Sequence, residues 1–213
     1  STEVLSLFKL ISYKPLVICW FLYLISLLVW RYKHRENVTS IAFEKLTKSQ
    51  VILSILMACI IGVAGIAAFI SAPNNFDSLT YHLPRIMHWI QNGNVDHYPT
   101  HIDRQLVLAP LSEFTMMHLQ ILSGSDQFAN LIQWFSMVGS MVAVTLIVRT
   151  LKGSLHSQLI AAVIALSVPM GLLQATSTQN DYAVTFWLVC LVYYVIKARE
   201  DFSINNTMLI GIC

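Results

Sequence analysis

Long apolar runs constrain this chain more than any other feature of its sequence. Five of them lie at about residues 15–30, 50–70, 128–149, 158–175 and 182–197, and a sixth begins near Ile204 and reaches Cys213. A helix that crosses a bilayer needs about 20 mostly apolar residues, because each helical residue rises only about 1.5 Å. The runs therefore predict an all-α fold, a polytopic bundle of transmembrane helices.

The composition excludes a soluble domain. Hydrophobic residues make up 56% of the chain and charged residues 11%, whereas a soluble domain has about a quarter charged residues. Such a chain lacks the polar side chains to cover a water-exposed surface. Because it starts with Ser1 and ends inside an apolar run, we expect it to be the N-terminal part of a longer protein, truncated at its C-terminus.

The basic residues give one consistent membrane orientation. They gather in three connections between the apolar runs: Arg31, Lys33, Arg35, Lys45 and Lys48, then Arg149 and Lys152, then Lys197 and Arg199. The positive-inside rule places all three connections in the cytoplasm. Residues 71–127, called the outer segment below, then lie outside, as does the connection at 176–180. Residues 1–14 stay ambiguous, because Lys9 and Lys14 would also lie outside.

The outer segment is too long and too patterned for a plain connector. We predict one helix from a cap at Asp77 or Ser78 to Asn92, ended by Gly93, with Pro84 either kinking it or starting its regular part. A second helix is expected from about Val107 to Leu122, before Gly124. Both are expected to lie in the outer membrane interface. Residues 1–49 would then form an N-terminal helix and a basic loop, and residues 50–213 a larger module.

Two carboxylates are placed on the same membrane face by this topology. Asp77 follows the second apolar run, and Asp181 lies at the outer start of the fifth. Partial burial at such a boundary raises a carboxylate pKa and makes the group a better proton acceptor. Each has a purely structural alternative as a helix cap.

The outer segment also holds most of the histidines and both outer arginines. The histidines are His82, His88, His97, His101 and His118, and their spacing does not favour a helical metal site. Arg85 and Arg104 suit a phosphate group, or else pair with acids and snorkel. Trp89 and Tyr98 suit stacking on a sugar, or an interfacial aromatic belt.

The chain resembles the GT-C glycosyltransferases, the membrane enzymes that include the protein O-mannosyltransferases and the aminoarabinose transferase of lipid A. It is most similar to a bacterial group with an F-D-x-x-x-Y-H-x-P motif, which here runs from Phe76 to Pro84. The likeness covers about residues 50–200. It includes Trp89, Gly93, Tyr98-Pro99, the run Ala109-Pro110-Leu111, the turn at 122–125, and the stretch Ser177 to Tyr182.

This resemblance implies a GT-C-like helical fold and an inverting transfer of a hexose or pentose from a polyprenyl-phosphate donor. Asp77 matches the catalytic base of the family, and Asp181 matches its second acid. The acceptor would be a lipid, a glycan or a protein, the site would face outward from a bacterial inner membrane, and no nucleic acid is expected as a partner. Substrate-binding roles are expected for Tyr81, His82, Arg85, Trp89, Arg104 and Asn180.

The sequence also departs from the family, and other classes stay open. Several relatives have two adjacent acids in this loop, whereas Ser78 follows Asp77 here, so a divalent metal is possible but not supported, and no metal ligand is assigned. A transporter or flippase would instead need acids or broken helices near the membrane midplane. A non-catalytic subunit of cell-envelope polysaccharide assembly would keep the helices and tolerate loss of Asp77.

Overall fold

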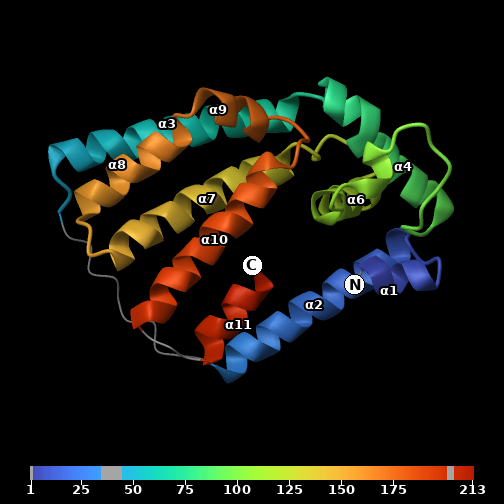
Figure 1. Cartoon of the computed structure of the whole chain (residues 1–213), viewed down its shortest axis with the longest axis horizontal. Helices are drawn as coiled ribbons and strands as arrows, with labels where there is room; N and C mark the ends of the chain where they lie inside the picture. Colours follow the sequence, from blue (N-terminus) through green and yellow to red (C-terminus); the bar gives the residue numbers. More distant parts are fainter. Residues whose placement is uncertain (1, 35–44, 201–203) are drawn as a thin grey trace. The chain divides into compact units, whose positions relative to one another are not determined.

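The computed structural model describes residues 2–34, 45–200 and 204–213; Arg35, one of the expected cytoplasmic cations, lies outside them. Every regular element in this part of the chain is a helix, which confirms the all-α class. In chain order (Figure 1) the elements are α1 Thr2–Leu7, α2 Tyr13–Lys33, α3 Lys48–Ile70, the π-helix η1 Ser78–His82, α4 Leu83–Asn92, α5 Arg104–Val107, α6 Leu111–Ser123, α7 Leu131–Thr150, α8 Leu155–Leu166, α9 Pro169–Ala175, α10 Asp181–Glu200 and α11 Ile204–Ile212.

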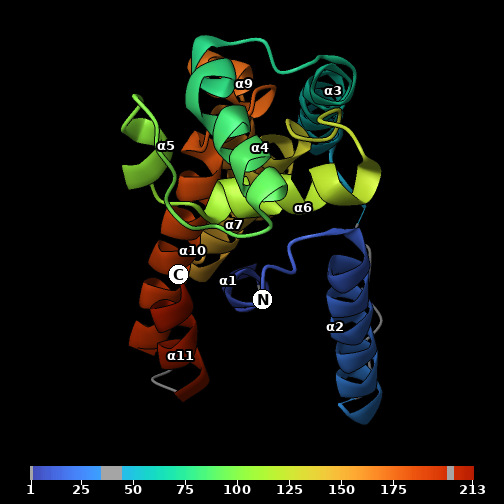
Figure 2. The same cartoon turned by 90° about the vertical axis from the view of Figure 1, so that its right-hand side faces the viewer.

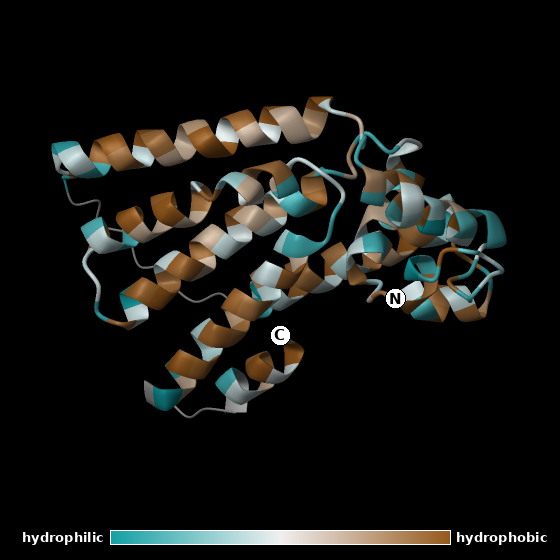
Figure 3. Ribbon diagram, turned by 45° about the horizontal axis from the view of Figure 1, so that its top comes forward, coloured by the Kyte–Doolittle hydropathy of each residue, from teal (hydrophilic) through white to brown (hydrophobic). Residues whose placement is uncertain are grey.

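Four of the described helices, α2, α3, α7 and α10, are long and apolar enough to cross a membrane. They correspond to the first, second, third and fifth predicted runs, and α11 begins where the sixth was expected. Figure 3 shows the hydrophobic colour along most of α3, with hydrophilic residues where that helix begins. These helices fit the predicted multi-pass membrane protein.

The fourth apolar run forms a broken helix where we expected a single span. Its two parts, α8 and α9, meet at a bend of 71°. Pro169 lies in the first turn of α9, and Val168 before it has an extended ψ of 113°. A proline disfavours the helical conformation of the residue before it and cannot donate a backbone hydrogen bond, so the helix has to stop and restart.

Two compact units divide the chain. Unit 1 contains residues 1–45 and 80–126, and unit 2 contains residues 46–79 and 127–213. The outer segment is thus shared between them, with η1 running across the boundary between Leu79 and Thr80. From the sequence we expect a boundary at residue 50, between an N-terminal helix with its basic loop and a larger module. The two compact units do not test that boundary, which stays a prediction.

Unit 2 is a bundle in which α7 packs against α10 and α8, and α3 packs against α8 and α7. Its buried centre consists mainly of alanine and methionine side chains: Ala64, Met137, Met141, Ala162, Leu166 and Ala175. Small side chains let membrane helices approach closely. At Gly139 on α7 even a Cβ atom would lie 2.7 Å from the Phe186 ring on α10. Close backbone approach therefore defines how these two helices pack.

Unit 1 is built around the crossing of α4 and α6, which Figures 1 and 2 both show side by side. Ile86 and Trp89 on α4 and Met116 and Met117 on α6 are buried. Ile86 and Trp89 are three residues apart and so lie on one face of α4, whereas Met116 and Met117 are neighbours on α6. Helical spacing in the sequence predicts an apolar stripe of Leu79, Leu83, Ile86, Met87 and Ile90. Ile86 is buried, but Leu79 and Met87 are exposed, so the expected stripe is only partly correct.

The N-terminal residues, whose orientation the sequence left open, pack against the outer segment. The backbone N–H of Ile11 donates to the Gly93 carbonyl at 3.2 Å, and the N–H of Val95 donates to the Ser6 hydroxyl at 2.9 Å. Thr2 Oγ1 lies 3.0 Å from Nε2 of His118. Residues 2–12 therefore pack against the part of the outer segment that belongs to unit 1.

The ends of the two outer helices confirm one prediction and correct another. Gly93 and Gly124 both have the left-handed φ of a helix end, +68° and +76°, as expected for glycine. The second helix begins only at Leu111 and not near Val107, because Pro110 interrupts the helix and Arg104–Val107 form the separate α5. Whether α4 and α6 lie in the membrane interface stays a prediction.

Candidate functional site

The helix that carries the F-D-x-x-x-Y-H-x-P motif begins two residues earlier than a cap at Asp77 would require. Asn75 Oδ1 accepts a hydrogen bond from the backbone N–H of Ser78 at 2.7 Å, which is the contact of an N-cap residue. Residues 76 and 77 are already helical. The expectation that Asp77 or Ser78 caps this helix is therefore wrong.

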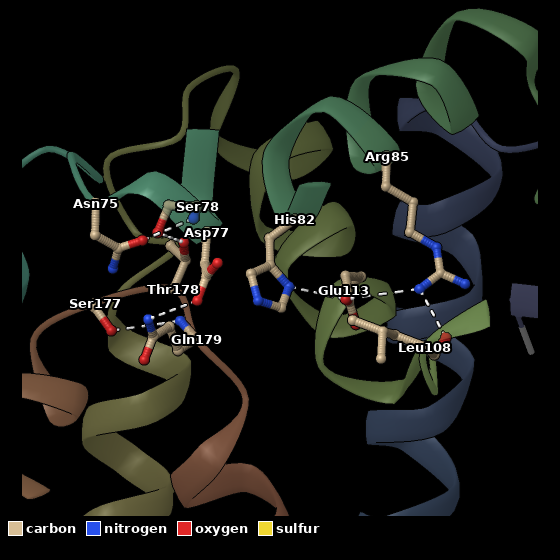
Figure 4. Close-up of polar contacts among 10 residues, drawn as sticks. All are labelled: Asn75, Asp77, Ser78, His82, Arg85, Leu108, Glu113, Ser177, Thr178 and Gln179. Carbon is tan, nitrogen blue, oxygen red and sulfur yellow. Dashed lines mark hydrogen bonds and ion pairs between the residues drawn. The ribbon is translucent and has the colours of Figure 1, made fainter. Parts of the chain in front are cut away.

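Asp77 instead interacts with the connection before α10. Nε2 of Gln179 donates a hydrogen bond to Oδ2 of Asp77 at 3.1 Å, and the Thr178 hydroxyl donates to the Ser78 hydroxyl (Figure 4). Ser78 and Thr178 are fully buried, whereas Asp77 is half-buried. A buried pair of hydroxyls thus fixes the two loops beside a carboxylate that keeps partial access to its surroundings.

Two further contacts within unit 2 place both loops at one end of the bundle. Nδ2 of Asn130, just before α7, donates to the Ser71 carbonyl at 2.8 Å. Oε1 of Gln133 on α7 accepts from the backbone N–H of Tyr182 at 2.8 Å. The end of α3 and the starts of α7 and α10 therefore meet there. Asp77 and Asp181 therefore lie at the same end of the bundle, and the membrane face to which this end belongs stays a prediction.

A cavity of about 360 Å³ lies in unit 2 next to the second acid. Asp181 and Tyr182 line it together with Met137, Met141, Met170 and Gly171. Its walls come from α7, α10 and both sides of the break between α8 and α9. A mostly apolar cavity with a carboxylate on its wall suits a ligand that has both an apolar and a polar part.

In unit 1, Pro84 explains both the π-helical turn η1 and the position of Gln105. A proline at position 84 has no N–H for the Thr80 carbonyl four residues earlier, and its ring crowds that carbonyl. The Thr80 carbonyl accepts a hydrogen bond from Nε2 of Gln105 at 2.8 Å instead. Pro84 itself lies in the first turn of α4, so the second of its two predicted roles is confirmed.

An ionic cluster that the sequence did not reveal lies between α4 and α6. Nδ1 of His82 lies 2.9 Å from Oε1 of Glu113, and Nη1 of Arg85 lies 3.7 Å from the same oxygen (Figure 4). Glu113 and His82 are 0% exposed and Arg85 is 4% exposed. No role for Glu113 was predicted from the sequence. One signal in the sequence could have indicated the cluster: Glu113 is an acid in the first turn of α6, among residues that form a buried stripe.

Arg85 is held by more than its acid. Its Nη1 donates to the Leu108 carbonyl at 2.8 Å, and its guanidinium lies 4.6 Å from the centre of the Trp89 ring. Burial lowers the pKa of Arg85, and the negative charge of Glu113 raises it again. An arginine pKa is so high that the side chain stays charged. The charged guanidinium of Arg85 thus lies beside the carboxyl group of Glu113.

The other predicted substrate-binding residues divide between the units. Tyr81 and Trp89 in unit 1 are buried, with the Tyr81 ring 4.2 Å from that of His82 and the Trp89 ring 5.3 Å from that of Phe114. Arg104 lies 5.8 Å from the centre of the Tyr81 ring. Asn180 belongs to unit 2, where its carbonyl accepts the N–H of Val184. Their roles in binding stay predictions.

Within the described residues no group of three or more His, Cys, Asp or Glu side chains is arranged to hold a metal ion. His88 stacks on Tyr98 with ring centres 4.0 Å apart, and His118 packs edge-on against Trp20 at 6.0 Å. Burial raises the pKa of Tyr98, so its hydroxyl stays protonated and donates to Gln105 at 3.0 Å. The histidines of the outer segment are thus spread over separate contacts.

The chain was compared with protein-family models, with curated proteins and with solved structures. None of them matches it. Membership of the GT-C superfamily therefore stays a prediction.

Asn75→Ala should lower the free energy of unfolding by about 1 kcal/mol, because it removes the capping acceptor of the helix. Asn75→Asp should keep the cap and most of the stability. The neighbouring Asn74→Ala, at an exposed position, is the matched control and should change nothing. Thermal unfolding of the purified protein in detergent measures all three. Equal melting temperatures for Asn75→Ala and Asn74→Ala would refute the assignment of the cap.

Proposed function

We propose that this chain belongs to a membrane glycosyltransferase that moves a hexose or pentose from a polyprenyl-phosphate donor to an acceptor and inverts the anomeric centre. The observation that carries the proposal is the hydrogen bond from Gln179 to Asp77. It joins the two loops whose acids, Asp77 and Asp181, match the catalytic acids of the GT-C family.

Asp77 has the environment that a general base requires. The helix cap is supplied by Asn75 and not by Asp77. Its partner Gln179 is an amide, which orients a carboxylate by donating one hydrogen bond but leaves its negative charge in place.

The transfer itself needs one proton acceptor and one leaving group. The carboxylate of Asp77 takes the proton of the acceptor hydroxyl, and the oxygen's electron pair forms the new bond to the anomeric carbon. The bond from that carbon to the phosphate oxygen breaks, and its electron pair leaves with the polyprenyl phosphate. Attack from the face opposite the leaving group inverts the centre. The phosphate needs positive or hydrogen-bonding groups to stabilise its developing charge.

Asp181 and the neighbouring cavity supply a place for an amphipathic substrate. The apolar walls formed by Met137, Met141 and Met170 suit the hydrocarbon part of a lipid, and Asp181 lies among the polar groups of the same cavity. We assign Asp181 to positioning of donor or acceptor. A lipid, glycan or protein acceptor at the outer face of a bacterial inner membrane fits this arrangement.

One observation favours a second candidate, a transporter or flippase. The bend of 71° between α8 and α9 makes a discontinuous span, and such spans are common at transporter binding sites. The cavity reaches this break through Leu166 and Val168. Its carboxylate, Asp181, however, belongs to the first turn of α10 and not to the break. Lipid flipping in proteoliposomes without sugar transfer would favour this second candidate. A non-catalytic assembly subunit would show neither activity.

Asp77→Asn should lower the transfer rate by about 10² or more, because the amide cannot take up the acceptor's proton. The measurement uses the full-length protein in membranes that contain radiolabelled polyprenyl-phosphate sugars, and it follows label appearing on an acceptor. Asp126→Asn, at an exposed acid of the same segment, should keep the rate within about twofold. A full rate for Asp77→Asn at normal expression would remove Asp77 from the mechanism.

Asp181→Asn should also reduce transfer strongly, on the order of tenfold, because asparagine keeps the shape but loses the charge that positions a substrate. The reduction should appear in the same labelling assay, with the melting temperature in detergent close to that of the wild type. An unchanged transfer rate would leave Asp181 with only its favourable charge at the start of α10.

A further inference from the structure

The cavity beside Asp181 lies entirely within unit 2, and its walls carry charge of only one sign. The described residues that line it include no lysine, arginine or histidine, and Asp181 is their single acid. In the described part of the chain the Asp181 carboxylate forms no ion pair. The cavity therefore presents an uncompensated negative charge to a ligand.

The remaining polar groups of the walls offer mainly hydrogen-bond acceptors. The hydroxyls of Ser140 and Thr185 donate to backbone carbonyls of their own helices, at 2.8 Å and 2.7 Å. A hydroxyl has one hydrogen, so both groups have only lone pairs left for a ligand. The Gln174 amide and the Tyr182 hydroxyl are the donors on these walls. A ligand that donates hydrogen bonds thus fits the polar part of the cavity better than one that only accepts them.

The start of α10 does not reverse this preference. The first N–H groups of a helix can bind an anion, but the N–H of Tyr182 already donates to Oε1 of Gln133 at 2.8 Å. The carboxylate of Asp181 lies in the same first turn and would repel a phosphate. The phosphate of the donor is bound best by cations and charge-assisted hydrogen bonds, so it finds few partners in this cavity.

The larger part of the cavity suits hydrocarbon. Its volume is about 360 Å³, and its apolar walls include Met137, Met141, Val144, Met170 and Val189. Methionine side chains adapt to the shape of an apolar ligand. A sugar or a peptide would leave polar groups unpaired against these walls, which is unfavourable, whereas an acyl chain would not. The walls on α7 and α10 also belong to helices that are apolar enough to cross a membrane.

We propose that this cavity binds the acceptor of the transfer reaction, and that the acceptor is a lipid with an uncharged, hydroxyl-bearing head group. A head-group hydroxyl donates to the Asp181 carboxylate, and the hydrocarbon lies against the methionines. Asp181 follows two residues after Gln179, which binds Asp77, so the head group lies at the same end of unit 2 as the proposed base. The inference rests on the proposed function and narrows it, because the polyprenyl-phosphate donor then binds elsewhere.

Photolabelling tests the class of ligand without any transfer activity. Full-length protein in membranes receives a diacylglycerol or a phosphatidate with the same diazirine-bearing acyl chain, and mass spectrometry locates the label. Diacylglycerol should label residues 137–144 and 181–189 at least about fivefold more than phosphatidate does, because the phosphate meets a charge of its own sign.

Asp181→Asn should bring the labelling by the two lipids within about twofold of each other, whereas Asp126→Asn should keep the preference of the wild type. Equal or stronger labelling of the wild type by phosphatidate, or labelling of these residues by neither lipid, would overturn the assignment of the cavity.

A kinetic readout separates an acceptor site from a donor site. Ala165 lines the cavity from α8, whereas its neighbour Ile164 is exposed and is not among the lining residues. Ala165→Phe, which fills the cavity, should lower the transfer rate at saturating donor at least about tenfold and leave the KM for the radiolabelled polyprenyl-phosphate sugars within about twofold. Ile164→Phe should change neither quantity, and Asp181→Asn should show the same split as Ala165→Phe.

A rise of about tenfold in the donor KM of Ala165→Phe or Asp181→Asn, at an unchanged maximal rate, would assign the cavity to the donor and overturn the inference. If the wild type transfers no sugar, the proposed function fails. The photolabelling comparison alone then supports or overturns the preference of the cavity for an uncharged, hydroxyl-bearing lipid.

Discussion

The hydrogen bond between Gln179 and Asp77 connects loops that are 102 residues apart in the sequence. The loop with Asp77 follows α3, and the loop with Gln179 leads into α10. The hydrogen bond between them can therefore form only when α3, α7 and α10 bring their ends together. The buried contact of Ser78 with Thr178 supports it. In lipid, where few other polar partners exist, such contacts are decisive for how the polar ends of helices come together. The candidate site depends on this arrangement.

Pro84 determines the backbone geometry at the C-terminal end of the same motif. Pro84 deprives the Thr80 carbonyl of its helical donor, Gln105 replaces that donor, and the helix passes through a π turn before α4 begins. Glu113 then fixes His82 at the end of that turn. Local chain chemistry creates the irregularity, and side chains from α5 and α6 stabilise it. The motif is therefore held at both ends by residues that lie far from it in the sequence.

The helices could be predicted from the sequence, because the length of an apolar run is a local signal. A glycine that ends a helix, such as Gly93 or Gly124, is also a local signal. The break at Pro169 has a local signal too, but the apolar run around it concealed the bend. The cap could not be assigned, because Asn75, Asp77 and Ser78 are all good capping residues and only the backbone selects one. Glu113 could not be found, because its burial and its pairing with His82 arise from the packing of α4 on α6.

The most direct test of the account is a disulfide between the two loops. With the native cysteines replaced, Ser78→Cys and Thr178→Cys should crosslink on mild oxidation in membranes, because the two side chains are in contact. Ser49→Cys with Thr178→Cys serves as the matched control pair, because Ser49 lies at the opposite end of α3. Efficient crosslinking of the first pair alone would support the meeting of the loops beside Asp77. Failure of that pair in folded protein would contradict it.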